Sequence, residues 1–381
     1  MEGRSLSSCA TSTRHSHSKV SAGQTTKSEA MNSRERILAA INRQPLDRIP
    51  TDIWATGEVW QKLAAHFGDG VDLYEALHID GIATVGADYA GPPLPEAPPG
   101  ETVDMWGIRS RPMNYGTGVY YEQSHNPLAD ARTIAELEQY RWPSADWFDY
   151  SHMRAAAEEA REKRAVKCGY MAIFFCHNLL RGLRQSLLDP HDDPEFTRHL
   201  LGRVSDFLYE HHLRMFEACD GLVDICEVTD DFGSQTGPLI SLKTFRECYR
   251  PHMERFIAVC RQFGIKVFHH DDGAIRPLLP DLVEMGIEVL NPIQSVCPGM
   301  EMEGLKRDFG HALCFHGGMD NQQVLPFGTP EDVRQAVRHA IDTLARDGTG
   351  YILAPCHNLQ AVTPVENIVA MYEEAWGYGR L

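Results

Sequence analysis

Short apolar segments alternate with stretches of helical pattern along the C-terminal half of this sequence. After residue 264 the order is IKVF, IRPLLPDLVEMG, EVLN, MEGLKRDFG, ALCFHG, TPEDVRQAVRHAIDTLARDG and YILAPC. Strands that are apolar almost throughout are typical of parallel strands covered on both faces, and strands that alternate with helices indicate βα units. This pattern predicts an α/β fold around a parallel sheet.

Eight strand-like segments can be counted over the whole chain. They span residues 48–54, 81–88, 167–175, 222–228, 265–270, 287–292, 312–317 and 351–356. Eight βα units favour a single (β/α)8 TIM barrel over an open sheet. A doubly wound sheet is the alternative, but no GxGxxG motif follows the first segment, so a dinucleotide-binding fold has no support.

Two regions do not follow the βα pattern. Residues 89–166 are too long for one crossover and include the turn-rich GPPLPEAPPG and then DMWGIRSRPMNYGTGVYYEQ, which predicts an inserted β-hairpin after the second strand. Residues 1–30 are rich in Ser and Thr and have almost no large apolar side chains, so we expect a disordered extension or an upstream-start artefact. Met31 is then a natural initiator, and residues 31–381 form the barrel domain.

Charge and composition exclude several classes of function. The chain has 36 basic and 53 acidic residues and a formal net charge of −17, which argues against a general nucleic-acid or anionic-membrane binder. No apolar run approaches the roughly 18 residues of a membrane helix. The ten cysteines form no CxxC pair, which indicates reduced thiols in a cytoplasmic protein. We expect a small-molecule substrate, and a homodimer by default.

Polar side chains stand at nearly every predicted strand end, where barrel chemistry gathers. They are Asp52, Asp88, Cys176, His177, Glu227, Asp230, Asp231, His269 to Asp272, Asn291, Gln294, His316, Asp320, Cys356 and His357. Because strand ends lead into loops, and loops are polar in any case, part of this set has a purely structural explanation.

His270 and Asp272 are the most specific pair in this set. One residue separates them, so in an extended segment both side chains point the same way. Imidazole and carboxylate together begin a site for zinc or another divalent ion, and Cys356 or His357 on the last strand could supply a third ligand. His269 and Asp271, one step out of phase, are expected to support the site. The alternative is a pair of buried histidines hydrogen-bonded to carboxylates.

Four stretches resemble the uroporphyrinogen decarboxylase-like superfamily, which includes the haem-pathway decarboxylase and corrinoid-dependent methyltransferases. They are RERILAAINRQPLDRIP at the start, TDDFGSQTGPLIS with FRECYRPHM, VFHHDDGAIRPLLPDLVEMGIEVLNPIQ, and YILAPCHNLQAVTPVENIVAMYE at the end. The resemblance covers roughly residues 31–381. It implies a TIM barrel and an enzyme, and it is less specific for a substrate.

The resemblance favours the methyltransferase branch. The decarboxylase has an arginine-rich segment soon after its first strand, where this chain has IWATGEVWQKL without arginine, although Asp88 and His357 match decarboxylase positions. The methyltransferases have a zinc site built from His-x-Cys-Gly and a later cysteine. Here Asp272 replaces the first cysteine, His357 takes the place of the second, and Cys356 stands one residue early. Such harder ligands suit zinc and also iron, manganese or cobalt.

These observations predict a metal-assisted methyltransferase or demethylase acting on a small O- or N-methylated compound. The resemblance implies a corrinoid, carried by a separate protein, as methyl acceptor. The expected metal ligands are His270, Asp272, His357 and Cys356; the expected catalytic residues are Glu227, Asp231 and Asp88; the expected substrate contacts are Asp52, Asp230, Gln235, Asn291 and His316.

Three alternatives remain open, one for a pair of residues and two for the function of the protein. For Asp230 and Asp231, the alternative to a role in the site is a structural one, as an N-cap or part of a turn. A decarboxylase-type lyase would need no metal and would recruit arginines such as Arg109, Arg181 or Arg276 to the barrel mouth. A non-catalytic barrel that kept the fold is the third, because fold likeness alone does not decide function.

Overall fold

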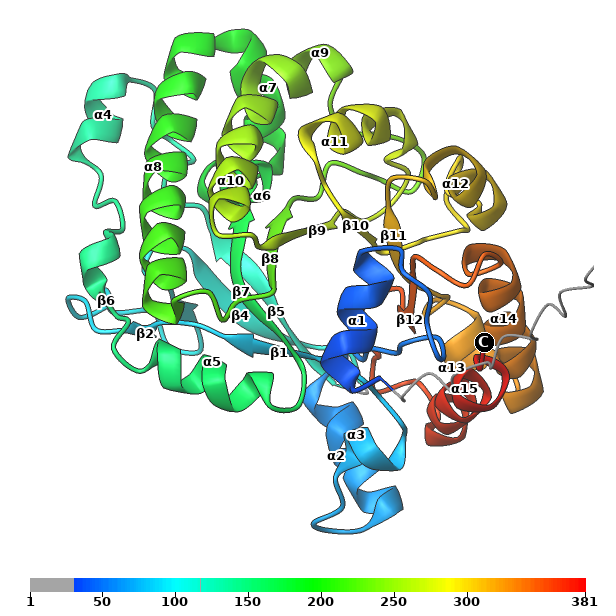
Figure 1. Cartoon of the computed structure of the whole chain (residues 1–381). Helices are drawn as coiled ribbons and strands as arrows, with labels where there is room; N and C mark the ends of the chain where they lie inside the picture. Colours follow the sequence, from blue (N-terminus) through cyan, green and yellow to red (C-terminus); the bar gives the residue numbers. More distant parts are fainter. Residues whose placement is uncertain (1–30, 117) are drawn as a thin grey trace, which may run out of the picture. The chain divides into compact units, whose positions relative to one another are not determined.

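A parallel sheet of seven strands forms the centre of the protein, which is a mixed α/β structure (Figure 1). The computed structural model describes residues 31–116 and 118–381, so the extension expected for residues 1–30 lies outside the described residues. The strand order is β1-β7-β8-β9-β10-β11-β12, and each neighbouring pair is parallel. The bounds are β1 Ile82–Val85, β7 Ala165–Ala172, β8 Ile225–Thr229, β9 Lys266–His270, β10 Val289–Asn291, β11 Cys314–Met319 and β12 Tyr351–Pro355.

The first predicted strand, residues 48–54, is not a regular strand. The backbone N–H of Asp52 donates to the carbonyl of Leu353 in β12 at 2.9 Å, and the N–H of Leu353 donates to the carbonyl of Pro50 at 2.9 Å. On the other side, the N–H of Gly81 donates to the carbonyl of Thr51 at 3.0 Å. Because Pro50 has no N–H to donate, the pairing stays short. The expected eight strands are therefore seven regular strands and one irregular segment that links β12 to the start of β1.

Helices lie around the outside of the sheet in Figure 1. Their bounds are α1 Ser33–Ile41, α2 Gly57–Phe67, α3 Leu73–Ala76, α4 Ile134–Gln139, α5 Met153–Arg161, α6 Ile173–Arg181, α7 Leu183–Asp192, α8 Pro194–Cys219, α9 Leu242–Thr244, α10 Arg250–Gln262, α11 Leu279–Met285, α12 Met302–Phe309, α13 Val324–Phe327, α14 Pro330–Leu344 and α15 Val365–Tyr378. Three short turns are η1 Ala145–Trp147, η2 Phe245–Tyr249 and η3 Arg276–Leu278.

Helix α14 shows how the sequence sets these elements. Thr329 and Asp332 form the capping box at its start, and each side chain accepts a hydrogen bond from the other residue's backbone N–H. Val333, Val337 and Ala340 recur at helical spacing and are buried. Apolar side chains at this spacing hold the helix against the sheet.

The third predicted strand, residues 167–175, ends earlier in the structure than the sequence pattern predicts. Strand β7 ends at Ala172 and α6 begins at Ile173, so Cys176 and His177 lie on a helix and not at a strand end. The apolar run AIFF fits a buried strand and a buried helix equally well by pattern alone. The helical geometry turns His177 toward Tyr249 and Asp189, away from a strand end.

Two small antiparallel sheets occupy the chain between β1 and β7. Strand β2 (Asp88–Tyr89) pairs with β6 (Phe148–Asp149), and β3 (Thr102–Val103), β4 (Arg109–Asn114) and β5 (Val119–His125) form a three-stranded sheet. The β4–β5 turn meets two other segments. Its Tyr115 hydroxyl donates to Oε1 of Gln360 at 3.1 Å, and the N–H of Val119 donates to Oε1 of Glu58 at 3.4 Å.

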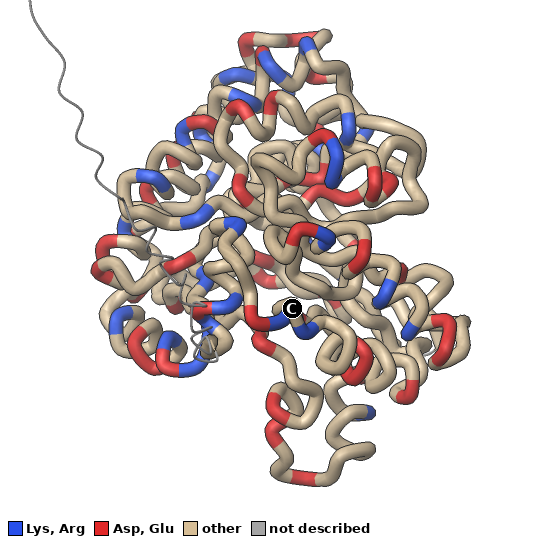
Figure 2. The backbone as a smooth tube through the Cα atoms, turned by 45° about the vertical axis from the view of Figure 1, so that its right-hand side comes forward, with Lys and Arg blue, Asp and Glu red and all other residues tan. Residues whose placement is uncertain are grey.

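Charged residues of both signs are interspersed along the chain in Figure 2, without one long basic stretch in that view. Among the helices of the described residues, none has both the length and the apolar character that crossing a bilayer requires.

Candidate metal centre and adjoining cavity

Three predicted metal ligands meet at the carboxyl ends of the parallel strands. His270 ends β9, Asp272 follows two residues later, and His357 follows β12. One ligand atom from each residue lies within 4.8 Å of the other two. Oδ2 of Asp272 is 3.9 Å from Nε2 of His270 and 3.9 Å from Nε2 of His357. The His270–Asp272–His357 triad is thus a set of two imidazoles around a carboxylate.

The hydrogen bonding of the Asp272 carboxylate is consistent with a divalent cation at the triad. Its Oδ1 atom is buried and has no hydrogen-bond partner among the described residues. A buried carboxylate oxygen without a partner costs free energy, and a cation bound to the Asp272 carboxylate, whose other oxygen lies between the two imidazoles, would offset this cost. Two imidazoles and one carboxylate are a donor set that suits Zn²⁺ and other divalent transition metals, and three protein ligands leave a position open.

A chain of hydrogen bonds orients His270. Its Nδ1 donates to Oδ1 of Asn291 at 2.6 Å. Nδ2 of Asn291 donates to Nδ1 of His316 at 2.7 Å, and Nε2 of His316 donates to Oδ2 of Asp52 at 3.0 Å. The directions follow from Asp52, because an ionised carboxylate can only accept. The Nε2 of His270 that faces the triad therefore carries a lone pair, as a metal ligand requires.

His357 is held differently. Its Nδ1 accepts the backbone N–H of Asn358 at 2.7 Å, so the neutral ring carries its proton on Nε2, the nitrogen nearest Asp272. Burial lowers the pKa of His357, although the negative charge of Asp272 acts in the opposite direction. Coordination through Nε2 requires this ring to give up its bond to Asn358.

His269 and Asp271 point away from the triad, as the alternation of an extended segment predicts. Both are fully buried. Nδ1 of His269 donates to the carbonyl of Val228 at 2.8 Å, and Oδ1 of Asp271 accepts the N–H of Gly233 at 3.0 Å. Burial lowers the pKa of His269 to about 4 and raises the pKa of Asp271 well above its usual range. These residues hold the strand ends beneath the site.

Cys356 lies outside the triad. Its Sγ donates to the carbonyl of Ile293 at 3.1 Å, and burial raises the pKa of the thiol to about 12. Thiolate, not thiol, is the form that binds a metal. Cys356, the fourth predicted ligand, is therefore hydrogen-bonded to a backbone carbonyl in the structure and does not join the triad.

The neighbouring residues Asp230 and Asp231 have different roles in the structure. Oδ1 of Asp231 is 3.9 Å from Nε2 of His270, and burial raises the pKa of Asp231. Asp230 is turned the other way and accepts the N–H groups of Ile173 at 3.3 Å and Phe175 at 2.8 Å. Asp230 therefore fixes the first turn of α6, which is the structural explanation left open above, and Asp231 alone reaches the triad.

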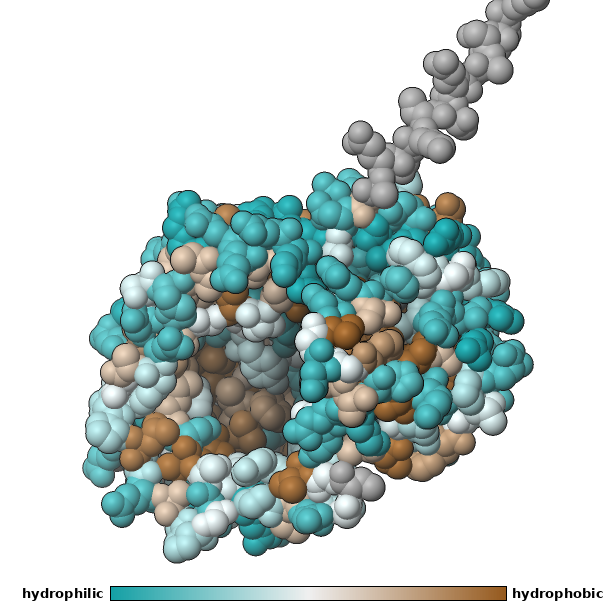
Figure 3. All heavy atoms as spheres, turned by 90° about the horizontal axis from the view of Figure 1, so that it is seen from below, coloured by the Kyte–Doolittle hydropathy of each residue, from teal (hydrophilic) through white to brown (hydrophobic). Residues whose placement is uncertain are grey.

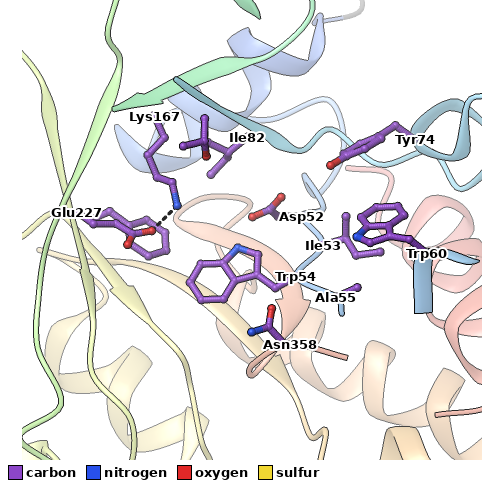
Figure 4. Close-up of a pocket in the computed structure, with 12 residues that line it drawn as sticks. Asp52, Ile53, Trp54, Ala55, Trp60, Tyr74, Ile82, Lys167, Glu227 and Asn358 are labelled. Carbon is purple, nitrogen blue, oxygen red and sulfur yellow. Dashed lines mark hydrogen bonds and ion pairs between the residues drawn. The ribbon is translucent and has the colours of Figure 1, made fainter. Parts of the chain in front are cut away.

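A cavity of about 430 Å³ adjoins this centre (Figure 4). Trp54 connects the two, because its ring centroid is 5.5 Å from that of His270 and 6.4 Å from that of His357. We call this space the aromatic cavity. Its lining residues are Asp52, Ile53, Trp54, Ala55, Trp60, Tyr74, Ile82, Thr84, Lys167, Glu227, Phe268 and Asn358.

Glu227, a predicted catalytic residue, lies inside the aromatic cavity and forms an ion pair with Lys167 (Figure 4). Lys167 is not among the predicted site residues. A lysine at the beginning of an apolar strand could have indicated this ion pair, because a lysine is rarely buried without a partner of opposite charge. The same two residues and Thr84 also line a second, more apolar cavity of about 470 Å³. Figure 3 shows that one face of the domain is hollowed, with a largely hydrophobic floor.

Two predicted site residues lie elsewhere. The Asp88 side chain is 81% exposed on β2, and its Oδ2 is 3.8 Å from Nδ1 of His152. Gln235 is exposed in the loop after β8, with its Oε1 3.7 Å from Sγ of Cys297. Neither lines the two cavities or contacts the triad.

The three arginines considered for a decarboxylase are engaged away from the cavities. Arg181 is buried and binds Asp189, Arg276 binds Asp308, and Arg109 is 3.7 Å from Glu101. Among the described residues that line the two cavities, Lys167 is the only lysine or arginine. A polycarboxylate would find a single cation there, already paired with Glu227.

Comparison with known proteins places the chain in a family. The family model for uroporphyrinogen decarboxylase (URO-D) matches residues 32–378. The chain belongs to the uroporphyrinogen decarboxylase family. No curated protein sequence gives a significant match to this member of the family.

Solved structures share the fold of this URO-D family member. A methyltransferase from Methanosarcina mazei aligns with a TM-score of 0.61 at 17% identity, over 91% of this chain and 99% of that chain. A B12-independent methionine synthase from Shewanella sp. W3-18-1, in complex with selenomethionine, aligns with a TM-score of 0.37 at 12% identity, over 59% and 64% of the two chains. The first likeness supports the barrel-like α/β fold, and the second is too weak to carry an argument.

Proposed function

We propose that this URO-D family protein is a metal-assisted methyltransferase that demethylates a small O- or N-methylated compound. The His270–Asp272–His357 triad, with the unpaired Oδ1 of Asp272, is the observation that carries the proposal. Support comes from the fold shared with a methyltransferase from Methanosarcina mazei. The proposal also takes residues 31–381 as one (β/α)8 barrel in which residues 48–54 complete the sheet.

The residues of the site would share the work as follows. A divalent ion, with zinc as the expected metal, supplies Lewis acidity that polarises a substrate oxygen or nitrogen. His270 holds its Nε2 lone pair toward that place through Asn291, and Asp272 supplies negative charge. Trp54 excludes water from one side of His270.

The proposed methyl transfer is a nucleophilic displacement at the methyl carbon. The bond between the methyl carbon and the substrate heteroatom breaks, and its electron pair stays on the heteroatom. A nucleophile attacks the methyl carbon with its own electron pair; the proposed nucleophile is a reduced corrinoid carried by a separate protein. The demethylated heteroatom takes a proton, and Asp231, with Oδ1 3.9 Å from Nε2 of His270, is the proposed proton donor.

Metal analysis of the full chain tests this proposal. We expect the wild-type protein, dialysed against Zn²⁺ and then metal-free buffer, to retain close to one ion per chain. The His270→Ala variant should lose most of this metal, because removing one of three ligands leaves a site that is too weak to survive dialysis.

The control is His311→Ala, which removes an exposed imidazole outside the triad and should leave the metal content unchanged. Full metal content in His270→Ala, or a wild-type protein that retains no metal, contradicts the proposal. Circular dichroism of both variants shows whether each has folded.

A further inference from the structure

The Lys167–Glu227 ion pair is an unusual feature to find inside a barrel. Lys167 comes from β7 and Glu227 from β8, and their side chains are only 19% and 7% exposed. An ammonium group has three N–H donors, and Glu227 is its one hydrogen-bond acceptor among the described residues. The pair therefore presents unused donors on Lys167 and a carboxylate acceptor on Glu227 at the point shared by both cavities.

Aromatic rings form much of the wall of the aromatic cavity (Figure 4). Nζ of Lys167 lies 5.5 Å from the ring centroid of Trp54. Across the cavity, Trp60 and Tyr74 are stacked with centroids 5.7 Å apart. Phe268 completes the aromatic lining. Flat ligands gain free energy against such walls by burying apolar area and by stacking.

The charged side chains that line the aromatic cavity determine which flat ligands, anionic, cationic or neutral, it can bind well. Asp52, Lys167 and Glu227 are its charged lining residues, and one cation faces two carboxylates. An anionic ligand meets this acidic excess, and a cationic ligand meets the ammonium group of Lys167. A neutral hydroxyl group suits the ion pair better, because it donates to Glu227 and accepts from Lys167 at once.

We infer that the aromatic cavity binds a neutral hydroxylated aromatic compound, with its hydroxyl group on the Lys167–Glu227 pair and its ring near Trp54. This inference rests on the proposed function, because it names the substrate class of that site. Trp54 lines the cavity and also lies against His270, so a ring held near Trp54 is bound on the side of the cavity that adjoins the triad.

Isothermal titration of the full-length wild-type protein tests the class without any methyl acceptor. We expect 2-methoxyphenol to bind about tenfold or more tightly than methoxybenzene, because the second compound lacks the hydroxyl group and leaves the ion pair without its partner. Equal affinity of the two compounds overturns the inference. Tighter binding of benzoate or benzyltrimethylammonium than of 2-methoxyphenol also overturns it, in favour of an anion or a cation site.

Two variants locate the contact. Within each variant, Lys167→Met or Glu227→Gln, the tenfold preference for 2-methoxyphenol over methoxybenzene should disappear. Lys243→Met, which changes an exposed side chain on α9 outside both cavities, is the matched control and should keep the tenfold preference. If Lys167→Met does not fold, Glu227→Gln, which preserves side-chain shape, decides the question. A full preference in Glu227→Gln overturns the assignment.

The same samples separate this inference from the proposed function. Hydroxyl-dependent binding in a protein that retains no metal supports the phenol site and contradicts the metal-assisted reaction. One bound metal ion per chain without any preference for 2-methoxyphenol supports the metal centre and contradicts the phenol site.

Discussion

Four consecutive side chains show how backbone alternation distributes tasks among single residues. His270 and Asp272, which lies just beyond the strand, both belong to the triad and lie on the same side of the backbone. His269 and Asp271 lie between them in sequence and are fully buried beneath the triad. The extended backbone at the end of β9 alone determines this division, so it could be predicted from the sequence. The partner of His270 could not, because Asn291 is 21 residues further along the chain and only the packing of β10 beside β9 brings the two together.

Cys356 gives a prediction at this scale. Cys356→Ser should retain the full metal content of the wild-type protein, because the thiol donates to the carbonyl of Ile293 and burial holds its pKa near 12, well above neutral pH. Metal analysis after dialysis measures this directly. A loss of metal as large as that expected for His270→Ala would restore Cys356 as a ligand.

At the scale of elements, the junction of α6 and α7 depends on a buried polar cluster. Nε of Arg181 donates to Oδ2 of Asp189 at 2.7 Å, and Nε2 of His177 is 3.1 Å from the same oxygen. The sequence pattern predicts His177 at a strand end, because the run AIFF fits a strand as well as a helix. The helical turn that begins at Ile173 instead directs His177 into this cluster.

The cluster predicts a pH-dependent stability. Burial alone would raise the pKa of Asp189, but hydrogen bonds from Arg181 and His177 outweigh it and lower the pKa. A lowered carboxyl pKa stabilises the fold above the unfolded value of about 4, and this stabilisation is lost as the pH falls further. Asp189→Asn should therefore reduce the free energy of unfolding by about 3 kcal/mol at pH 7, because it leaves Arg181 buried without its counter-ion.

Urea denaturation at pH 7 and near pH 3 measures this difference. The gap between wild type and Asp189→Asn should shrink at the lower pH, because below about pH 4 the unfolded wild-type chain gains a proton on this carboxyl that the folded chain does not. A gap of the same size at both pH values would show that shape, not charge, explains the effect. Asp192→Asn, on the same helix, is the matched control for loss of one carboxylate.

At the scale of the whole molecule, the site joins parts of the chain that are far apart in sequence. His270 and Asp272 come from the end of β9, and His357 follows β12, which is linked to the start of β1 through residues 50–52. A ligand that needs all three side chains binds only the folded chain, so its binding free energy adds to stability.

Metal binding is therefore expected to stabilise the protein as a whole. Zn²⁺ at about 100 times its dissociation constant should raise the free energy of unfolding by about 2.7 kcal/mol, and a chelator should remove this gain. Thermal or chemical denaturation with and without the metal provides the measurement. The Asp272→Ala variant should show almost no stabilisation; a gain equal to that of the wild type would place the bound ion outside the triad.

The sequence by itself determined the α/β class, the order of most strands, and the residue types at the strand ends. These follow from local patterns: apolar runs, helical spacing and the two-residue alternation of extended backbone. Only the tertiary structure decided that residues 48–54 link two strands irregularly, that Asp52 and His316 orient His270 through Asn291, and that Lys167 pairs with Glu227. The reason is physical: hydrogen bonds and ion pairs between distant segments depend on which strands become neighbours, and no local pattern in a single chain encodes that distance.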